Sequence, residues 1–442
     1  MESTNAMSRL PQTENLRSGQ RAVIDRFLET KDVVAQLPTG YGKTFTGSYC
    51  YARLRQQNEV NRLLWIVPRN SQENQAAEEI PNDLQKLTGD KITSFSVGYG
   101  PAAALGQHRK GRAEVFTITV QSLMSRHTLE VVHQMMQTGR WMVVVDEHHH
   151  YGDDDKSRWS QALRSLPYTT RLAMSATPAR SDGKSFFPNP DVSVTYLDAF
   201  TENSVKELKC HIYDYEIDII HGGNGESEVT PYRLSDLFRE VGSDAPTPAE
   251  IDQFIAARKM RWSPKYISPL IHFPVERMVD NRARGIQCQM LIQAMSCMHA
   301  ELVCRQVSEL VPEGMKVDWV GTGPYGKNDQ ENARVIKEFC PAKDSYGRRN
   351  WTLDVLVNVG MAGEGLDTTD VTEVVFLNKA GITPTTLQII GRAARIMKQE
   401  KTVPAYINVD SESGLAELTA DKNAHKWIGR NIMAVFDHED PP

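Results

Sequence analysis

The sequence predicts an α/β protein with two tandem parallel-sheet domains. Short β-branched runs alternate with helical patterns from about residue 20 to 200, and the alternation returns from about 286 to 410. Such alternation is typical of βαβ units, whose parallel sheet is covered by helices on both faces. At 442 residues the chain is long enough for two or three domains. We expect a first domain (1–200), a linker with a small helical insert (201–285), a second domain (286–415) and a C-terminal helix or tail (416–442).

Apolar runs bounded by turn residues predict the buried strands of both domains. In the first domain these runs are 32–37, 62–67, 114–120, 141–146 and 171–175, with helix candidates at 44–57 and 129–137. In the second domain, strands are expected at 289–294, 316–321, 353–359, 373–377 and 404–409, and a helix at 299–310.

The remaining segments are less regular in composition. Residues 202–220 suggest a helix followed by an extended strand, and the Gly, Asn, Ser and Pro content of 221–231 predicts a loop. Helices are expected at 231–241, 246–260 and 420–436.

Composition excludes several classes of protein. Charged residues make up 24% and hydrophobic residues 40%, as in ordinary globular proteins. The net charge of −6 provides no global basic footprint for nucleic acid, so any such groove would have to be locally basic. Six scattered cysteines without a C-x-x-C pair favour a reduced chain with no zinc module. No signal peptide or membrane span is evident, so we expect a cytoplasmic protein with no membrane partner.

The stretch "DVVAQLPTGYGKT" is a strand, a glycine-containing turn, and Lys-Thr at the start of a helix. Backbone N–H groups at such a helix start favour phosphates, Lys43 would neutralise their charge, and the hydroxyl of Thr44 would bind Mg²⁺. Leu37 occupies the position of the first glycine of the strict phosphate-loop pattern, and a plain glycine-rich turn is the alternative. The candidate nucleotide-binding residues are Thr39, Gly40, Tyr41, Gly42, Lys43 and Thr44.

The stretch "VVVDEHHHYGDDD" is a buried strand that delivers two carboxylates at its C-terminal end, where open α/β sheets place their ligands. We expect Asp146 to hold Mg²⁺ together with Thr44, and Glu147 to deprotonate an attacking water. A structural ion pair with Lys43 is the alternative. Adjacent histidines diverge on a strand or helix, so a shared metal site is disfavoured, and His148 and His150 receive no role.

These residues and their order resemble the superfamily 2 helicases and translocases of the DExH group. "LPTGYGKT" is similar to motif I, "VVVDEHHH" to motif II with His149 at its fourth position, and "SATP" to motif III. "VPRN" and "ITVQSL" stand where motifs Ia and Ib fall. "LRSGQ" is similar to the upstream adenine-reading segment. "DVLVNVGMAGEGLD" resembles motif V and "QIIGRAAR" motif VI, so the resemblance covers roughly residues 16 to 410.

The resemblance implies two RecA-like domains that hydrolyse ATP with Mg²⁺ in the cleft between them. It assigns catalytic roles to Gln388, Arg392 and Arg395 beside Asp146 and Glu147, with the arginines stabilising charge on the γ-phosphoryl group. It adds Arg17, Gln20, Gly365 and Asp367 to the nucleotide site, and it gives His149, Ser175 and Thr177 a coupling role. Contacts with nucleic acid would come from Pro68, Arg69, Gln121, Ser122 and Gly360.

The implied function is an ATP-dependent helicase or translocase. DNA is favoured over RNA because Val359 stands where many RNA-unwinding relatives carry a threonine. DNA repair or antiviral defence are the expected settings, with a nuclease or another defence-complex protein as a partner. The alternative is an ATP-gated DNA clamp or sensor that recruits a nuclease without unwinding. A kinase is disfavoured by the second α/β domain.

Overall fold

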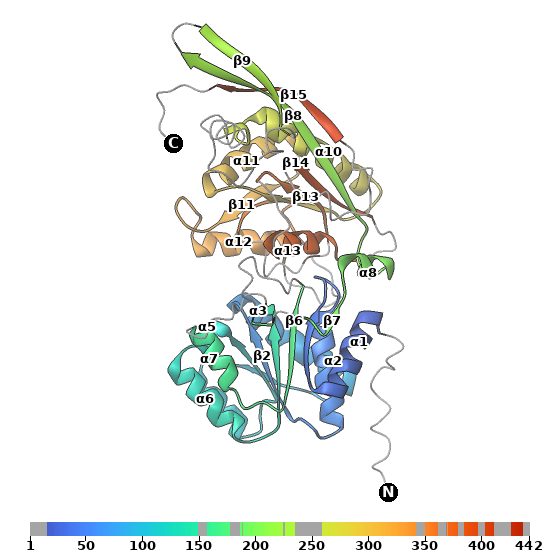
Figure 1. Ribbon diagram of the computed structural model, residues 1–442, viewed down its shortest axis with the longest axis vertical. Helices are drawn as coiled ribbons and strands as arrows, with labels where there is room; N and C mark the ends of the chain where they lie inside the picture. The colour runs from blue at the N-terminus through green and yellow to red at the C-terminus, as the bar shows by residue number, and fades with distance from the viewer. Residues whose placement is uncertain are drawn as a thin grey trace. The chain divides into compact units, whose positions relative to one another are not determined.

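The computed structural model describes residues 16–148, 157–176, 186–187, 189–223, 226–234, 259–341, 350–360, 368, 370–378, 384–396, 403–410 and 426–435. The chain divides into two compact units, Met1–Val205 and Lys206–Pro442 (Figure 1). Within the described residues, no helix combines the length and the apolar character needed to span a membrane.

The first unit is built on a seven-stranded sheet in the order β3-β4-β2-β5-β6-β1-β7, with every neighbouring pair parallel. All five strands that the sequence predicts here are present, and the short edge strands β3 and β7 are additions. The strands are β1 Asp32–Gln36, β2 Arg62–Val67, β3 Ser94–Ser96, β4 Val115–Thr119, β5 Trp141–Asp146, β6 Thr170–Ser175 and β7 Val192–Ser193.

Helices cover both faces of this sheet (Figure 1). On one face, helices α4 to α7 pack on side chains such as Ile66, Ile118 and Val145. On the other face α2 lies close to the sheet, because a Cβ at Gly47 would come within 2.6 Å of the Trp65 ring. The helices are α1 Ser18–Thr30, α2 Lys43–Gln56, α3 Asn70–Thr88, α4 Pro101–Arg109, α5 Val120–Leu123, α6 Arg126–Met136, α7 Arg158–Ser165 and α8 Tyr196–Thr201.

The second unit has a sheet in the order β11-β12-β10-β13-β14-β8-β15, and β9 pairs antiparallel with β8. All five predicted strands of this half are confirmed. The described helices are α10 Pro264–Ala283, α11 Cys297–Leu310, α12 Asp329–Phe339 and α13 Pro384–Ala393. The strands are β8 Leu208–Gly223, β9 Glu226–Arg233, β10 Gln289–Gln293, β11 Val317–Gly321, β12 Val355–Val359, β13 Val371–Phe376, β14 Ala405–Asp410 and β15 Lys426–Val435. The tandem α/β fold with two parallel sheets is therefore confirmed.

Several segments differ from the expected division of the chain. The loop expected at 221–231 is wrong, because 221–223 belong to β8 and 226–231 belong to β9. The stretch expected as a linker supplies β8, which pairs with β14 and β15, so the second unit begins at Lys206. The helix expected at 420–436 is wrong, because 426–435 form strand β15. Tryptophan, isoleucine and valine in "KWIGRNIMAV" suit a strand, and pairing along β8 outweighs local helix propensity. Of the helix expected at 231–241, residues 231–233 end β9, and those after Leu234 lie outside the described residues.

Candidate nucleotide and nucleic-acid sites

The phosphate loop connects β1 to α2. Gly40 and Gly42 have φ angles of 83° and 92°, in the left-handed region that glycine adopts readily. Gly42 caps α2, whose first N–H groups have no acceptor within the helix. Together with Lys43 and Thr44 in this first turn, those N–H groups form the anion-binding end of a helix.

Substitution of Gly42 by alanine should weaken nucleotide binding. The left-handed backbone disfavours alanine by about 1 kcal/mol or more, and its Cβ would lie 2.7 Å from Nε2 of Gln20. Titration with a fluorescent ATP analogue checks the affinity, and thermal unfolding checks the fold. The matched control is Gly111→Ala, which has a φ of 62° but no atom within 4 Å of the new Cβ. Equal nucleotide affinity of the Gly42→Ala and Gly111→Ala variants would contradict this account of the loop.

Residues at the start of helix α1 hydrogen-bond to the backbone of the phosphate loop. Arg17 donates from Nη1 to the Gly40 carbonyl at 3.1 Å, and Gln20 donates from Nε2 to the Tyr41 carbonyl at 3.1 Å. The Oε1 atom of Gln20 accepts from the Arg17 N–H at 3.3 Å. The structure thus brings both predicted adenine-reading residues to the phosphate loop, where their contacts hold its backbone.

Tyr41 anchors the loop to the rest of the unit. Its side chain is fully buried, and its hydroxyl accepts from the Gly19 N–H at 3.1 Å and donates to Glu202 at 2.7 Å. Its own N–H donates to the Pro38 carbonyl at 3.1 Å. The side chain of Tyr41 thus supports the loop from within, and its contact with nucleotide stays a prediction. No sequence signal pointed to Glu202, which lies just after α8, far along the chain.

The acidic pair lies at the C-terminal end of β5. Nζ of Lys43 lies 2.6 Å from Oε1 of Glu147, and both side chains are nearly buried at 11% and 13% exposure. Glu147 adopts a φ of 47°, and its N–H donates to Oδ1 of Asp146 at 2.9 Å. Burial raises the pKa of Asp146, the neighbouring Glu147 carboxylate raises it further, and Lys43 acts in the opposite direction. The ion pair expected as an alternative is thus present, and it joins the phosphate loop to the acidic pair.

The donor set fits a magnesium ion. The Thr44 hydroxyl and the Asp146 carboxylate are hard oxygen donors, and Mg²⁺ is commonly held by one or two such groups plus substrate phosphates. In the described part of the chain, no three His, Cys, Asp or Glu side chains gather as a metal cluster.

Strand β6 lies between the strands that carry the phosphate loop and the acidic pair. The carbonyl of its last residue, Ser175, accepts from the Leu37 N–H at 2.9 Å, and its side chain is buried. Gln36 donates to the Ala176 carbonyl at 3.4 Å. Ser175 therefore connects directly to the start of the phosphate loop, whereas Thr177 and His149 lie outside the described residues, so their coupling role stays a prediction.

His148, to which the sequence gave no role, is fully buried beside the acidic pair. Its ring packs edge-on against Phe187 with centroids 5.3 Å apart, and neither nitrogen has a hydrogen-bond partner among the described residues. Burial lowers the pKa of His148 to about 4. Three consecutive histidines carry no sequence signal that singles out His148.

The neutral His148 ring should make the first unit sensitive to acid. An ordinary histidine titrates near 6.5, so the unfolded chain takes up a proton that the folded protein resists until about pH 4. Stability should therefore be full above pH 6.5 and fall progressively below it. His148→Leu should reduce the loss of unfolding free energy between pH 7 and 4.5 by about 2 kcal/mol, measured by urea denaturation. The exposed His127→Leu is the control, and an unchanged pH profile in His148→Leu would refute the prediction.

In the second unit, α13 carries the predicted catalytic residues of motif VI. Gln388 and Arg392 are buried, and they lie one helical turn apart on the same face. Arg395 is half-buried just beyond the helix. The Lys206 N–H donates to the Ala394 carbonyl at 2.7 Å, which ties the end of this segment to the start of the unit. Gly365 and Asp367 lie outside the described residues.

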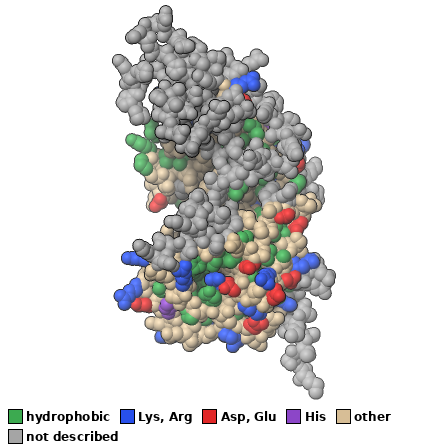
Figure 2. Space-filling view, viewed as in Figure 1, with side chains coloured by type: hydrophobic (Ala, Val, Ile, Leu, Met, Phe, Trp, Pro, Cys, Tyr) green, Lys and Arg blue, Asp and Glu red, His purple; other side chains and the backbone are tan. Residues whose placement is uncertain are grey.

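The predicted nucleic-acid residues differ in their accessibility. Pro68 is buried, Arg69 and Gln121 are exposed, and Ser122 is half-buried, so contacts of these residues with nucleic acid stay predictions. Arg69 follows β2 and Gln121 follows β4, which are neighbours in the sheet, so both stand at its C-terminal edge. Gly360 is exposed at the end of β12, with a φ of 71°. Figure 2 shows acidic and basic side chains mixed over the visible, described face of the first unit.

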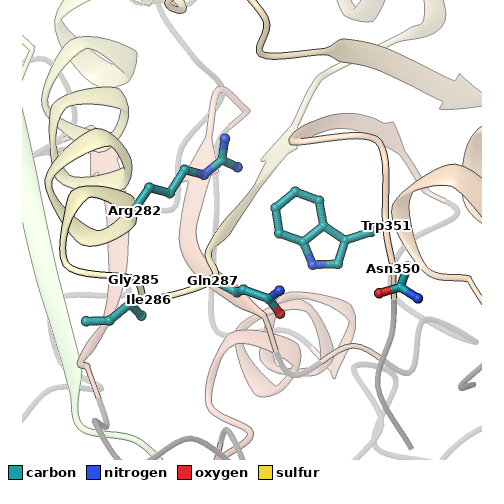
Figure 3. Close-up of a pocket in the computed structure, with 6 residues that line it drawn as sticks. All are labelled: Arg282, Gly285, Ile286, Gln287, Asn350 and Trp351. Carbon is teal, nitrogen blue, oxygen red and sulfur yellow. The ribbon is translucent and has the colours of Figure 1, made fainter. Parts of the chain in front are cut away.

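A cavity of about 430 Å³ opens in the second unit (Figure 3). It lies where chain segments enter β10 and β12, the opposite end of the strands from Gly360. Two of its polar side chains are committed to the fold, since Arg282 pairs with Asp354 at 2.6 Å and the Trp351 indole N–H donates to Asp370 at 2.9 Å. We assign this cavity no role. Its lining residues are Arg282, Gly285, Ile286, Gln287, Asn350 and Trp351.

The fold defines the class as a protein with two tandem parallel-sheet α/β units, and comparison with known proteins agrees. Residues 13–180 match the model of a family described as the res subunit of type III restriction enzymes. A search of curated proteins found no match.

Three solved structures are similar to nearly the whole chain. A fragment assigned as an HsdR subunit of a type I restriction enzyme from Vibrio vulnificus YJ016 has a TM-score of 0.59 at 13% identity, covering 98% of this chain and 70% of that one. The type ISP restriction-modification enzyme LlaBIII bound to DNA has a TM-score of 0.55 at 15% identity, covering 90% and 28%. The DUF1998 helicase MrfA bound to DNA has a TM-score of 0.55 at 13% identity, covering 96% and 52%.

These likenesses confirm the tandem RecA-like fold and the resemblance to superfamily 2 helicases and restriction enzymes. The chain spans about a quarter to a half of the length of the latter two structures, so their full activities do not transfer with the fold.

Proposed function

We propose that this protein is an ATP-dependent helicase or translocase that acts on nucleic acid, with DNA favoured. The observation that carries the proposal is the contact between Lys43 and Glu147, at 2.6 Å, beside the start of α2. This contact supports the proposal because the Lys43 ammonium and the Glu147 carboxylate meet at a helix N-terminus, where bound phosphates and an attacking water would lie close together.

The proposed chemistry begins with exchange of this ion pair. The phosphates of ATP bind at the N-terminus of α2 and compete with Glu147 for the Lys43 ammonium. Release of the Glu147 carboxylate leaves it available to accept a proton from water. ATP binding would therefore itself release the Glu147 carboxylate for catalysis.

Magnesium and the second unit complete the proposal. Thr44 and Asp146 would hold Mg²⁺, which neutralises phosphate charge when bound. Arg392 and Arg395 would stabilise the charge that develops on the transferred phosphoryl group. The buried Gln388 lies one turn from Arg392 and would position it.

Preference for DNA is supported by two observations. LlaBIII and MrfA were solved bound to DNA, and Val359 replaces the threonine typical of RNA-unwinding relatives. The restriction-enzyme likenesses favour a role in defence against foreign DNA or in repair, together with a nuclease partner.

The test is a displacement assay on a series of substrates. Binding to single-stranded DNA, duplex DNA, forked DNA and RNA identifies the preferred ligand. A triplex-forming third strand on duplex DNA, or the annealed strand of a fork, should then be released only with ATP and not in the Glu147→Gln variant. ATP-dependent binding without any displacement would support the clamp and overturn the motor, and preference for RNA would overturn the DNA assignment.

A further inference from the structure

Two aromatic side chains stand out on the described surface. Tyr99 is 66% exposed and Tyr325 is 77% exposed, and no other aromatic residue belongs to the exposed large hydrophobic side chains of the described residues. Single exposed rings are common on protein surfaces, so the inference depends on where these two rings stand.

The two tyrosines occupy equivalent positions in the two units. Tyr99 follows β3 and Tyr325 follows β11, and each strand lies at the edge of its sheet with one parallel neighbour, β4 or β12. The loops also share the pattern V-G-x-G-P, at 97–101 and 320–324, in which Tyr99 is the variable residue, whereas Tyr325 directly follows the proline. Both rings therefore stand at the C-terminal edge of a parallel sheet, where such sheets place their ligands.

The loop that carries Tyr99 packs on Ser122, which is predicted to contact nucleic acid. A Cβ at Gly98 would lie 2.8 Å from Oγ of Ser122, so the loop approaches α5 closely. The Tyr99 hydroxyl lies 3.4 Å from Oδ1 of Asn74 in the first turns of α3, which begins after Arg69. Tyr99 thus contacts α3, and its loop lies against the half-buried Ser122.

Around Tyr325, a tight turn holds the ring outward. The Gly326 N–H donates to the Gly323 carbonyl at 2.9 Å, and the Lys327 N–H donates to the Gly321 carbonyl at 3.1 Å. Tyr325 has a φ of 63°, a backbone conformation that glycine would adopt with less strain. This turn therefore keeps an aromatic ring exposed at the end of β11.

We propose that Tyr99 and Tyr325 stack on bases of a nucleic-acid strand, one tyrosine in each unit. The inference rests on the proposed function and adds the mode of strand recognition. Stacking requires only the face of a base, so it grips any sequence, as a translocating protein must. It also suits a chain whose net charge of −6 provides no global attraction for nucleic acid.

The experiment measures binding of labelled oligo-dT of about 20 nucleotides by fluorescence anisotropy. Tyr99→Ala and Tyr325→Ala should each weaken binding by about 5- to 100-fold, whereas Tyr99→Phe and Tyr325→Phe, which keep the ring, should bind like the wild type. A second oligonucleotide of equal length with abasic sites removes the bases and keeps the phosphates. The wild type should bind it more weakly than oligo-dT, and the alanine variants should show less of this difference.

The outcomes separate the two proposals. If the wild type binds oligo-dT and the alanine variants bind it equally well, or if abasic DNA binds the wild type as tightly as oligo-dT, the stacking inference is wrong and the proposed function stands. If the wild type binds no nucleic acid at all, both fail. Unchanged melting temperatures of all four variants establish that the fold is intact, as expected for exposed side chains.

Discussion

Replacing Glu147 by glutamine should lower kcat for ATP hydrolysis by about 10²- to 10⁴-fold, because the water loses its general base. Glutamine cannot form the ion pair with Lys43, so phosphates no longer compete with a carboxylate for that ammonium. The variant should therefore bind ATP at least as tightly as the wild type. Phosphate release measured under single-turnover conditions gives the rate, and a fluorescent ATP analogue gives the affinity.

The control for this variant is Glu130→Gln. Glu130 is an exposed acid in the same unit that pairs only with its helical neighbour Arg126, at 2.9 Å, among the contacts described. Its replacement should leave the rate unchanged. A Glu147→Gln protein that turns over within tenfold of the wild type would remove Glu147 as the base.

Replacing Arg392 by alanine should lower kcat by about 10³-fold or more while ATP affinity changes little, because an arginine of this kind acts on charge that develops in the transition state. Arg392→Lys should not restore the rate, since a lysine lacks the planar fork of donors. The exposed Arg305→Ala serves as the control. Since Arg392 is itself buried, thermal unfolding must show an intact second unit. A parallel loss of kcat and of ATP affinity would mean that Arg392 supports nucleotide binding rather than catalysis.

Sequence patterns predicted the sheets well where burial is complete. Strands β2 and β5 match their predicted bounds, 62–67 and 141–146, because continuous apolar runs end at turn residues or at the Asp-Glu pair. Strand β15 was predicted as a helix because its pairing partner β8 lies far away in the sequence, and periodicity within ten residues does not report such a partner.

The residues of the candidate nucleotide site could be predicted from the sequence, but the contacts among them could not. Gly40, Gly42 and Lys43 follow from the backbone that a phosphate loop needs. That Tyr41 turns inward to Glu202 and that His148 is buried depend on tertiary packing. Sequence spacing does not distinguish Tyr41 and His148 from their neighbours, so their burial could be seen only in the folded chain.

The central claim is that nucleic acid and ATP hydrolysis are coupled in this protein. The most direct measurement is the steady-state ATPase rate with and without a saturating amount of the nucleic acid that binds best. We expect nucleic acid to stimulate the wild-type ATPase rate by about tenfold or more, equivalent to roughly 1.4 kcal/mol of barrier lowering. We expect no stimulation of the Glu147→Gln variant. Equal wild-type rates with and without every nucleic acid tested would contradict the claim.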